Sequence, residues 1–288
     1  MNYSNYNKKQ LIILDDKIIF EDDFNEPIYA YLNILSLRKI ISFGKNFNQN
    51  IAMIPNNVEK IFLGKNFQKS IIDIPSSIKS IIFANDSIFF NLLDYLHNDL
   101  MELILGDEYN LVINKFPHNL NTLILGKNYA QKIYIFPNNL KYLDIGESYI
   151  EPLDNLPESL ETLIIGGKFN NFIKYPSNLK YLIIKKNTLF NKELENLPSS
   201  LIYLSIQNNY IFSINKLNDS ILCLSLGDYY SGTINNFPLN LYKLILSENF
   251  NYDFIYLPPS IEIIEITQKY KHINSLIYRF PNLKVIIK

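Results

Sequence analysis

The sequence has no tryptophan, one cysteine (Cys223) and three histidines among its 288 residues. A single cysteine excludes the intrachain disulfide framework that stabilises many small secreted domains. The 27 basic and 28 acidic side chains nearly cancel, so the chain lacks the positive excess typical of nucleic-acid-binding proteins. There is no run of about 20 apolar residues that could form a membrane helix, and the polar segment Met1–Gln10 does not look like a signal peptide. These absences predict a cytoplasmic protein with no nucleic-acid or membrane partner.

Motifs for catalysis or cofactor binding are also missing from the sequence. It contains no Gly-rich phosphate loop, no H-E-x-x-H and no G-x-S-x-G. His97 and His118 could approach one metal ion, but no Cys or acidic partner recurs at ligand spacing, so we interpret both as exposed turn residues. Cys223 has no evident His or Asp partner, and the acidic pairs at 15–16 and 22–23 suit solvated turns. We therefore predict no enzyme, no cofactor, and no catalytic or metal-binding residue.

What the sequence does contain is a repeat of about 20 residues. Prolines mark it at positions 55, 75, 117, 137, 157, 176, 198, 238, 258 and 281, and His97 and Asn218 stand where two further prolines would fall. The units share the core order L-x-x-L-x-L-x-x-N, as in residues 120–128, with Gly after the last Leu and Asn at the end in many of them; an aromatic residue follows and, four positions later, an aliphatic one. The Asn position is suited to a side-chain ladder at the turn. We attribute the remaining Asn-rich composition to coding bias.

Two known repeat families share this pattern. The core L-x-x-L-x-L-x-x-N resembles the leucine-rich repeat, and the stretch from Gly44 to Pro55 (GKNFNQNIAMIP) resembles the FNIP repeat of amoebozoans and of the giant viruses that infect them. The resemblance extends over residues 17–288 in roughly thirteen units. The short bacterial leucine-rich repeats, which have a similar L-P-x-x-L order, are the alternative. The resemblance implies a protein-binding scaffold in a cell's cytoplasm, or in the host cytoplasm if the protein is viral. FNIP proteins often carry an F-box, and its absence here argues against a substrate adapter for ubiquitination.

The repeat predicts a mainly β fold. L-x-x-L-x-L alternates with the period of a strand, and the return path is short and contains proline, which leaves little room for a helix. We expect strands at 17–20, 39–43, 59–63, 79–83, 101–105, 121–125, 141–145, 161–165, 180–184, 202–206, 222–226, 242–246, 262–266 and 284–287. The convex segments should be extended or short 3-10 backbone, with room for a helical turn in the longer units 75–97, 176–198 and 258–281. The predicted architecture is one right-handed, leucine-rich-repeat-like solenoid or horseshoe over 1–288. Residues 1–16 form an N-terminal cap with a hairpin, and one parallel sheet lies on the concave face.

The outward-facing strand residues form the candidate partner-binding site. In each unit these are the residue between the last two aliphatics and the residue two positions earlier. The candidates are Phe62, Ile82, Ile104, Ile124, Tyr142, Ile164, Tyr181, Ile183, Tyr203 and Ile245. Apolar patches beside aromatic residues mark binding surfaces, although Ile and Tyr also simply suit a pleated strand.

Two functions therefore stay open. One is a non-enzymatic scaffold that binds an unidentified protein through the concave face. The alternative is a self-associating structural or virion component, because the last strand leaves an edge that could pair with another copy in a homo-oligomer.

Overall fold

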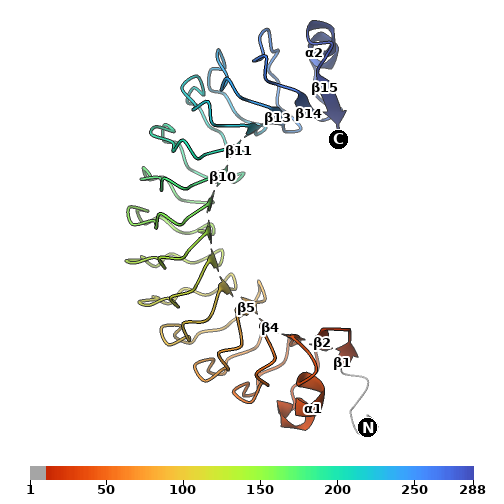
Figure 1. Cartoon of the computed structure of the whole chain (residues 1–288), viewed down its shortest axis with the longest axis vertical. Coiled ribbons are helices and arrows are strands. Elements are labelled where there is room, and N and C mark those ends of the chain that lie inside the picture. The colour runs from red at the N-terminus through yellow and green to blue at the C-terminus, as the bar shows by residue number, and fades with distance from the viewer. Residues whose placement is uncertain (1–10) are drawn as a thin grey trace. The chain divides into compact units, whose positions relative to one another are not determined.

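The computed structural model of the chain describes residues 11–288, and its main element is a 15-stranded sheet whose spatial order follows chain order (Figure 1). The strands are β1 (Leu11–Ile13), β2 (Lys17–Phe20), β3 (Ile40–Ser42), β4 (Lys60–Leu63), β5 (Ser80–Phe83), β6 (Glu102–Ile104), β7 (Thr122–Ile124), β8 (Tyr142–Asp144), β9 (Thr162–Ile165), β10 (Tyr181–Ile184), β11 (Tyr203–Ile206), β12 (Cys223–Leu226), β13 (Lys243–Leu246), β14 (Ile263–Ile266) and β15 (Lys284–Ile287). Each strand from β2 to β15 falls within a predicted range, so the period-2 pattern located the sheet correctly.

The chain divides into two compact units, with the boundary between Gly146 and Glu147. In the first unit, β1 pairs antiparallel with β2, and β2 to β8 pair in parallel. In the second unit, β9 to β15 pair in parallel. The predicted hairpin is thus confirmed, while residues 1–10 of the expected N-terminal cap lie outside the described residues. The fold is a leucine-rich-repeat-like solenoid of about fourteen turns, against the roughly thirteen we expected. That one solenoid domain spans residues 1–288 stays a prediction.

The segments that connect the strands are mostly turns and extended backbone, as predicted. The helical segments are η1 (Ile28–Tyr31) and α1 (Leu32–Leu35) in the first turn and α2 (Ile273–Arg279) near the last. Of the three longer units that could have held a helical turn, only 258–281 does so. Units 75–97 and 176–198 take up their two additional residues in irregular loop.

Stacked aromatic rings run through the core of each unit. The ring centroids are 6.2 Å apart for Phe47–Phe67, 6.1 Å for Phe67–Phe89, 6.3 Å for Phe89–Tyr109, 6.4 Å for Tyr109–Tyr129, 6.3 Å for Phe169–Phe190 and 6.3 Å for Tyr210–Tyr230. Such spacing is within the range in which aromatic pairs attract one another. The strand aliphatics that alternate with the face residues are buried against these rings, so each turn covers the apolar edge of its neighbour.

Asparagine side chains join successive turns on the loop side. Asn25 Oδ1 accepts a hydrogen bond from the backbone N–H of Asn48 (2.8 Å), and Asn48 Oδ1 accepts one from Gln68 N–H (2.9 Å). Asn110 Oδ1 does the same for Ala130 N–H (2.9 Å). These amides satisfy backbone donors that a strand or helix would otherwise pair. Attributing the Asn content to coding bias was therefore incomplete, because many of these residues hold adjacent turns together.

Candidate partner-binding face

The first and third residues of each strand present their side chains to the same face of the sheet. The parallel register aligns these side chains in two rows, which we call the first row and the third row. In the first unit the first row is Ile40, Lys60, Ser80, Glu102, Thr122 and Tyr142, and the third row is Ser42, Phe62, Ile82, Ile104, Ile124 and Asp144. In the second unit the first row is Thr162, Tyr181, Tyr203, Cys223, Lys243, Ile263 and Lys284, and the third row is Ile164, Ile183, Ser205, Ser225, Ile245, Glu265 and Ile286. We call this surface the sheet face.

All ten predicted site residues lie on the sheet face, five in each unit. Their exposure is lower than a free binding surface would suggest, because side chains of adjacent strands cover one another. The exposed fraction of Tyr181 is 39% and that of Ile164 is 8%, so Ile164 is buried, and the other eight residues are half-buried. Their role in binding stays a prediction.

An ion pair crosses the sheet face of the first unit. Lys60 Nζ lies 2.9 Å from Glu102 Oε2, although β5 runs between their strands, and the hydroxyl of Ser80 on β5 also donates to that oxygen. Burial alone would raise the pKa of Glu102. The hydrogen bonds from Ser80 and Lys60 and the charge of Lys60 outweigh it and hold this pKa below its usual value.

Phe62 lies beside this ion pair and is partly covered by cations. The ammonium groups of Lys17 and Lys60 lie 4.9 and 5.5 Å from the centre of its ring, within the range of a cation–π contact. Beyond it, the third row continues as Ile82, Ile104 and Ile124, three isoleucines on consecutive strands. The first unit thus presents a short apolar ladder with a charged group at one end.

At the other end of that ladder is Tyr142, in the first row of β8. Burial and the nearby negative charge of Asp144 both raise the pKa of its hydroxyl, so the group stays neutral. A neutral tyrosine beside isoleucines can pack its ring against an apolar side chain and donate a hydrogen bond at its rim.

The sheet face of the second unit is more polar. The Gln207 amide donates to Ser205 Oγ (3.0 Å) and Ser225 Oγ (2.8 Å) and accepts from Ser247 Oγ (2.9 Å). We did not predict this network, because Gln207 and Ser247 occupy the glycine position after their strands. A polar residue in that position, beside serines in the third row, is the signal that would have found it.

Aromatic and charged pairs flank the network. The rings of Tyr181 and Tyr203 are 6.2 Å apart and tilted by 45°. Lys243 binds Glu265 at 2.6 Å, and Lys288 binds the same carboxylate at 2.8 Å. The predicted apolar stripe is therefore interrupted in the second unit, where Ile164, Ile183 and the two tyrosines lie side by side but Ile245 lies between Ser225 and Glu265.

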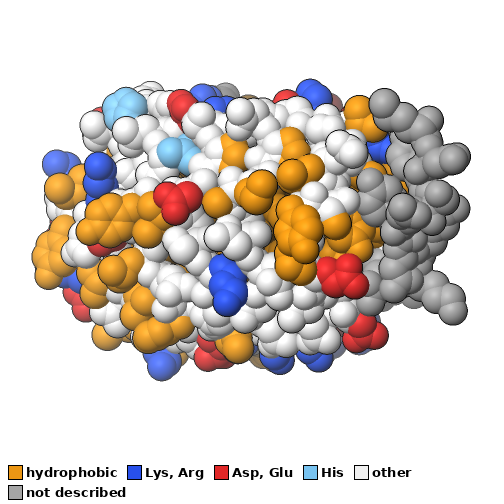
Figure 2. Space-filling model, turned by 90° about the horizontal axis from the view of Figure 1, so that it is seen from below, with side chains coloured by type: hydrophobic (Ala, Val, Ile, Leu, Met, Phe, Trp, Pro, Cys, Tyr) orange, Lys and Arg blue, Asp and Glu red, His pale blue; other side chains and the backbone are white. Residues whose placement is uncertain are grey.

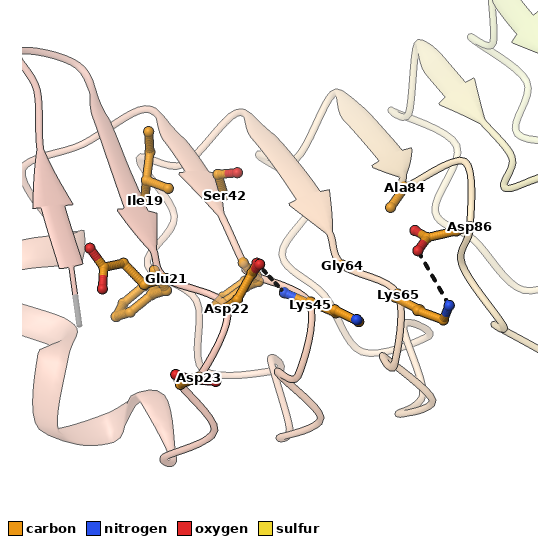
Figure 3. Close-up of a pocket in the computed structure, with 13 residues that line it drawn as sticks. Ile19, Glu21, Asp22, Asp23, Ser42, Lys45, Gly64, Lys65, Ala84 and Asp86 are labelled. Carbon is orange, nitrogen blue, oxygen red and sulfur yellow. Dashed lines mark hydrogen bonds and ion pairs between the residues drawn. The ribbon is translucent and has the colours of Figure 1, made fainter.

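A depression of about 710 Å³ lies at the carboxyl ends of β2 to β5 (Figure 3). Asp22 in it accepts a hydrogen bond from the backbone N–H of Lys45 (3.0 Å), and Lys65 binds Asp86 at 3.4 Å. Figure 3 shows Glu21 and Asp23 on different sides of Asp22 rather than converging with it. The charged side chains of this depression therefore stabilise the turns, and they do not converge on one point where a ligand could bind.

The histidines and the cysteine are not brought together in the described part of the chain. Across residues 11–288, no three His, Cys, Asp or Glu side chains are placed to hold a metal ion. His118 is exposed, as predicted, but both ring nitrogens of His97 are buried, which corrects our interpretation of that residue. Cys223 lies on the sheet face, where burial raises the pKa of its thiol. None of the described helices has the length and apolar character to span a bilayer.

The surface seen in Figure 2 shows hydrophobic side chains in small groups, with basic and acidic residues interspersed. No stripe of one charge sign stands out on this side of the molecule. The basic and acidic residues, which nearly balance in number, are thus also intermixed on the surface seen in this view.

Comparisons with known proteins agree with this architecture. A model of the FNIP Repeat family matches residues 39–66, 110–148 and 129–168. The structure is similar to that of CroV588, described as a novel circular LRR protein structure, with 24% identity and a TM-score of 0.67. That superposition covers 91% of this chain and 48% of the other, so the chain spans about half the length of CroV588.

Two further structures superpose only loosely. YopM from Yersinia enterocolitica WA-314 has 18% identity and a TM-score of 0.44 over 81% of this chain and 60% of its own. A leucine-rich repeat protein from Bacteroides ovatus ATCC 8483 has 14% identity and a TM-score of 0.23 over 97% of this chain and 90% of its own. No curated protein matches the sequence. The matched segments and the parallel sheet together support an FNIP-type repeat protein with a leucine-rich-repeat-like solenoid fold.

Proposed function

We propose that the protein is a non-enzymatic scaffold that binds another protein through the sheet face of its first unit. The observation that carries this proposal is the ladder of Ile82, Ile104 and Ile124, with Tyr142 on the next strand and the Lys60–Glu102 pair alongside it in the first row. An apolar centre with an aromatic anchor and a polar rim is the usual composition of a protein interface.

The second unit contributes less to this surface. Its third row contains Ser205 and Ser225, which are already bonded to Gln207. A partner would gain little by displacing those bonds. We therefore assign the contact to Ile104, Ile124 and Tyr142 of the first unit.

The test uses substitutions that the same rows already accommodate. Ile104→Ser and Ile124→Ser introduce the residue found at Ser42, and Tyr142→Thr introduces the residue found at Thr122, so the triple variant should fold. The matched control is Leu92→Ser, Val112→Ser, Tyr134→Thr, which removes three exposed apolar side chains from the loop side of the same unit.

Both variants and the wild type would be used to capture proteins from a lysate of the cells in which the protein occurs. We expect the sheet-face variant to lose partners that the wild type and the loop-side variant retain, with thermal melting unchanged. Equal recovery by all three proteins, or loss by the loop-side variant alone, would refute binding through the sheet face.

A further inference from the structure

The sheet face of the first unit carries opposite charges at its two ends. Lys17 of β2 is in register with the first row, and Asp144 of β8 is in the third row at the other end. Between them, the carboxylate of Glu102 is paired with Lys60, so these two charges cancel. The face is therefore positive near β2 and negative near β8, and the isoleucine ladder lies between the two ends.

The ammonium group of Lys17 extends toward the ladder. Lys17 Nζ lies 4.9 Å from the centre of the Phe62 ring, although β3 runs between their strands. None of the carboxylates in residues 11–288 forms an ion pair with Lys17, and residues 1–10 contain neither Asp nor Glu. Lys17 therefore brings an unpaired positive charge to the end of an apolar surface.

A hydroxyl donor lies on the strand that the Lys17 side chain crosses. Ser42, in the third row of β3, is in register with Ile19 on one side and Phe62 on the other. Figure 3 shows Ile19 and Ser42 projecting to the same side of the sheet. Ser42 is half-buried, and its hydroxyl forms no hydrogen bond within the described part of the chain. A carboxylate between Lys17 and Ser42 would accept hydrogen bonds from both groups.

We propose that the partner protein places an extended peptide segment on this face, in which an Asp or Glu lies three or four residues from an apolar anchor. This inference rests on the proposed function and adds the chemistry of the partner. Neighbouring strands are about 4.8 Å apart, so Phe62 on β4 is about 10 Å from Ile104 on β6 and about 14 Å from Ile124 on β7. An extended peptide that crosses the strands advances about 3.3 Å per residue. A carboxylate above Phe62 thus places the third or fourth residue along the segment over Ile104 or Ile124.

A carboxylate matches this end of the face better than a phosphate group does. A phosphorylated side chain carries nearly two negative charges at pH 7 and is usually bound by clustered arginines. The two arginines of the chain are Arg38 and Arg279, and neither belongs to the rows of the sheet face. One ammonium group with one hydroxyl instead suits a group of charge −1. The negative charge of Asp144 at the far end orients the segment, because an acidic residue there would be repelled.

The first experiment selects random 12-residue peptides, displayed on phage, for binding to the full chain. We expect the enriched peptides to share an Asp or Glu three or four positions from a large aliphatic or aromatic residue. They should not bind the variant Ile104→Ser, Ile124→Ser, Tyr142→Thr, which lacks the apolar contact. This comparison restricts the result to peptides that occupy the sheet face.

The second experiment measures the Kd of one enriched peptide by fluorescence anisotropy at low ionic strength. Lys17→Gln removes the charge and should raise the Kd about threefold, whereas Lys17→Glu reverses it and should raise the Kd about tenfold. Added salt should reduce both effects. Lys69→Glu makes the same change of charge at an exposed loop position of the same unit and should leave the Kd unchanged. Thermal melting shows that each variant is folded.

A charge swap tests the contact directly. The same peptide with Lys in place of its acidic residue should bind Lys17→Glu more tightly than it binds the wild type. A peptide with phosphoserine in that place should bind the wild type no more tightly than the original. A large gain in affinity with phosphoserine would overturn the assignment to a carboxylate.

Failure of this inference can be told from failure of the proposed function. Peptides that need the apolar contact but share no acidic residue, or that bind Lys17→Glu as tightly as the wild type, would overturn the acidic segment and leave the sheet face as the binding surface. Peptides that bind the triple variant as tightly as the wild type would overturn both. A library without enriched peptides would overturn an extended segment as the occupant, and the capture from lysate would then decide whether the face binds a protein at all.

Discussion

Gly126 lies directly against the carbonyl oxygen of Gly106 in the preceding turn, so that a Cβ added to Gly126 would stand 1.9 Å from that oxygen. The glycine is required by this close approach of two backbones, because its φ angle is not in the left-handed region. Gly126→Ala should force the turns apart and lower the free energy of unfolding by about 1–3 kcal/mol. Urea denaturation at neutral pH measures this change.

Ala84 provides the matched control, because it occupies the same position after β5 and already carries a Cβ. Ala84→Gly should change the free energy of unfolding by less than about 1 kcal/mol, mainly through the greater freedom of glycine in the unfolded chain. If Gly126→Ala were as mild as Ala84→Gly, close backbone approach would not explain the glycine.

A second prediction concerns His97, whose two ring nitrogens are buried without a hydrogen-bond partner. Burial lowers its pKa below 6.5, Asp99 acts to raise it, and Lys79 acts to lower it. As pH falls, the unfolded chain therefore binds a proton at His97 before the folded chain does. The free energy of unfolding is not reduced by His97 above the unfolded-state pKa, and it decreases as pH falls from about 7 toward 5.

His97→Pro restores the residue that most other turns have in this position. It should raise the free energy of unfolding at neutral pH by about 0.4–1 kcal/mol, and its advantage over the wild type should widen in urea titrations at lower pH. His118→Asn, which replaces an exposed histidine of the next turn, should stay close to wild type. A constant difference between wild type and His97→Pro across this pH range would contradict the argument.

The Lys60–Glu102 pair gives a third prediction with the opposite pH dependence. Because the pKa of Glu102 is lowered from 4.5, its carboxylate stabilises the fold above that value and loses this contribution as pH falls through the folded-state pKa. Glu102→Gln should cost about 1 kcal/mol at pH 7 and progressively less in acid. The control is Glu59→Gln, which breaks the exposed pair of Lys39 and Glu59 and should have almost no effect. An equal loss of unfolding free energy in both variants would show that partial burial does not strengthen the Lys60–Glu102 pair.

The asparagine ladder gives a fourth prediction. Asn48→Ala leaves the backbone N–H of Gln68 without its acceptor and should lower the free energy of unfolding by about 1 kcal/mol. Asn48→Asp keeps an oxygen in that place and should cost less. Hydrogen exchange of the Gln68 amide, followed by NMR, would report the same loss locally. Unchanged exchange in Asn48→Ala would exclude the bond as a stabilising contact.

The strands could be predicted because their alternation repeats in almost every turn, so that each copy supports the assignment of the next. The helical turn α1 was not predicted, because we expected the segments between strands to be extended or short 3-10 backbone. Ile28, Tyr31, Ile34 and Leu35 are buried at a helical spacing, but we interpreted that region as another extended repeat. The spacing of these four residues is the signal that would have predicted the helical turn.

The composition of the sheet face could be predicted, and its accessibility could not. Which residues point outward depends only on the strand register. How much of Phe62 remains exposed depends on how Lys17 and Lys60 reach over it from other strands. The conformations of long, flexible side chains depend on contacts with neighbouring turns. A sequence pattern within one turn does not predict these contacts.

The bond from Asn48 to the backbone of Gln68 also has a consequence for how such genes change in length. The bond recognises a main-chain N–H, which every residue except proline has, so one turn does not need a particular successor. Losing or duplicating the coding stretch for one whole turn brings equivalent positions of the remaining turns back into contact. We therefore expect related proteins to differ mainly by whole turns, while insertions of one or two residues stay within the loops, as they do in units 75–97 and 176–198.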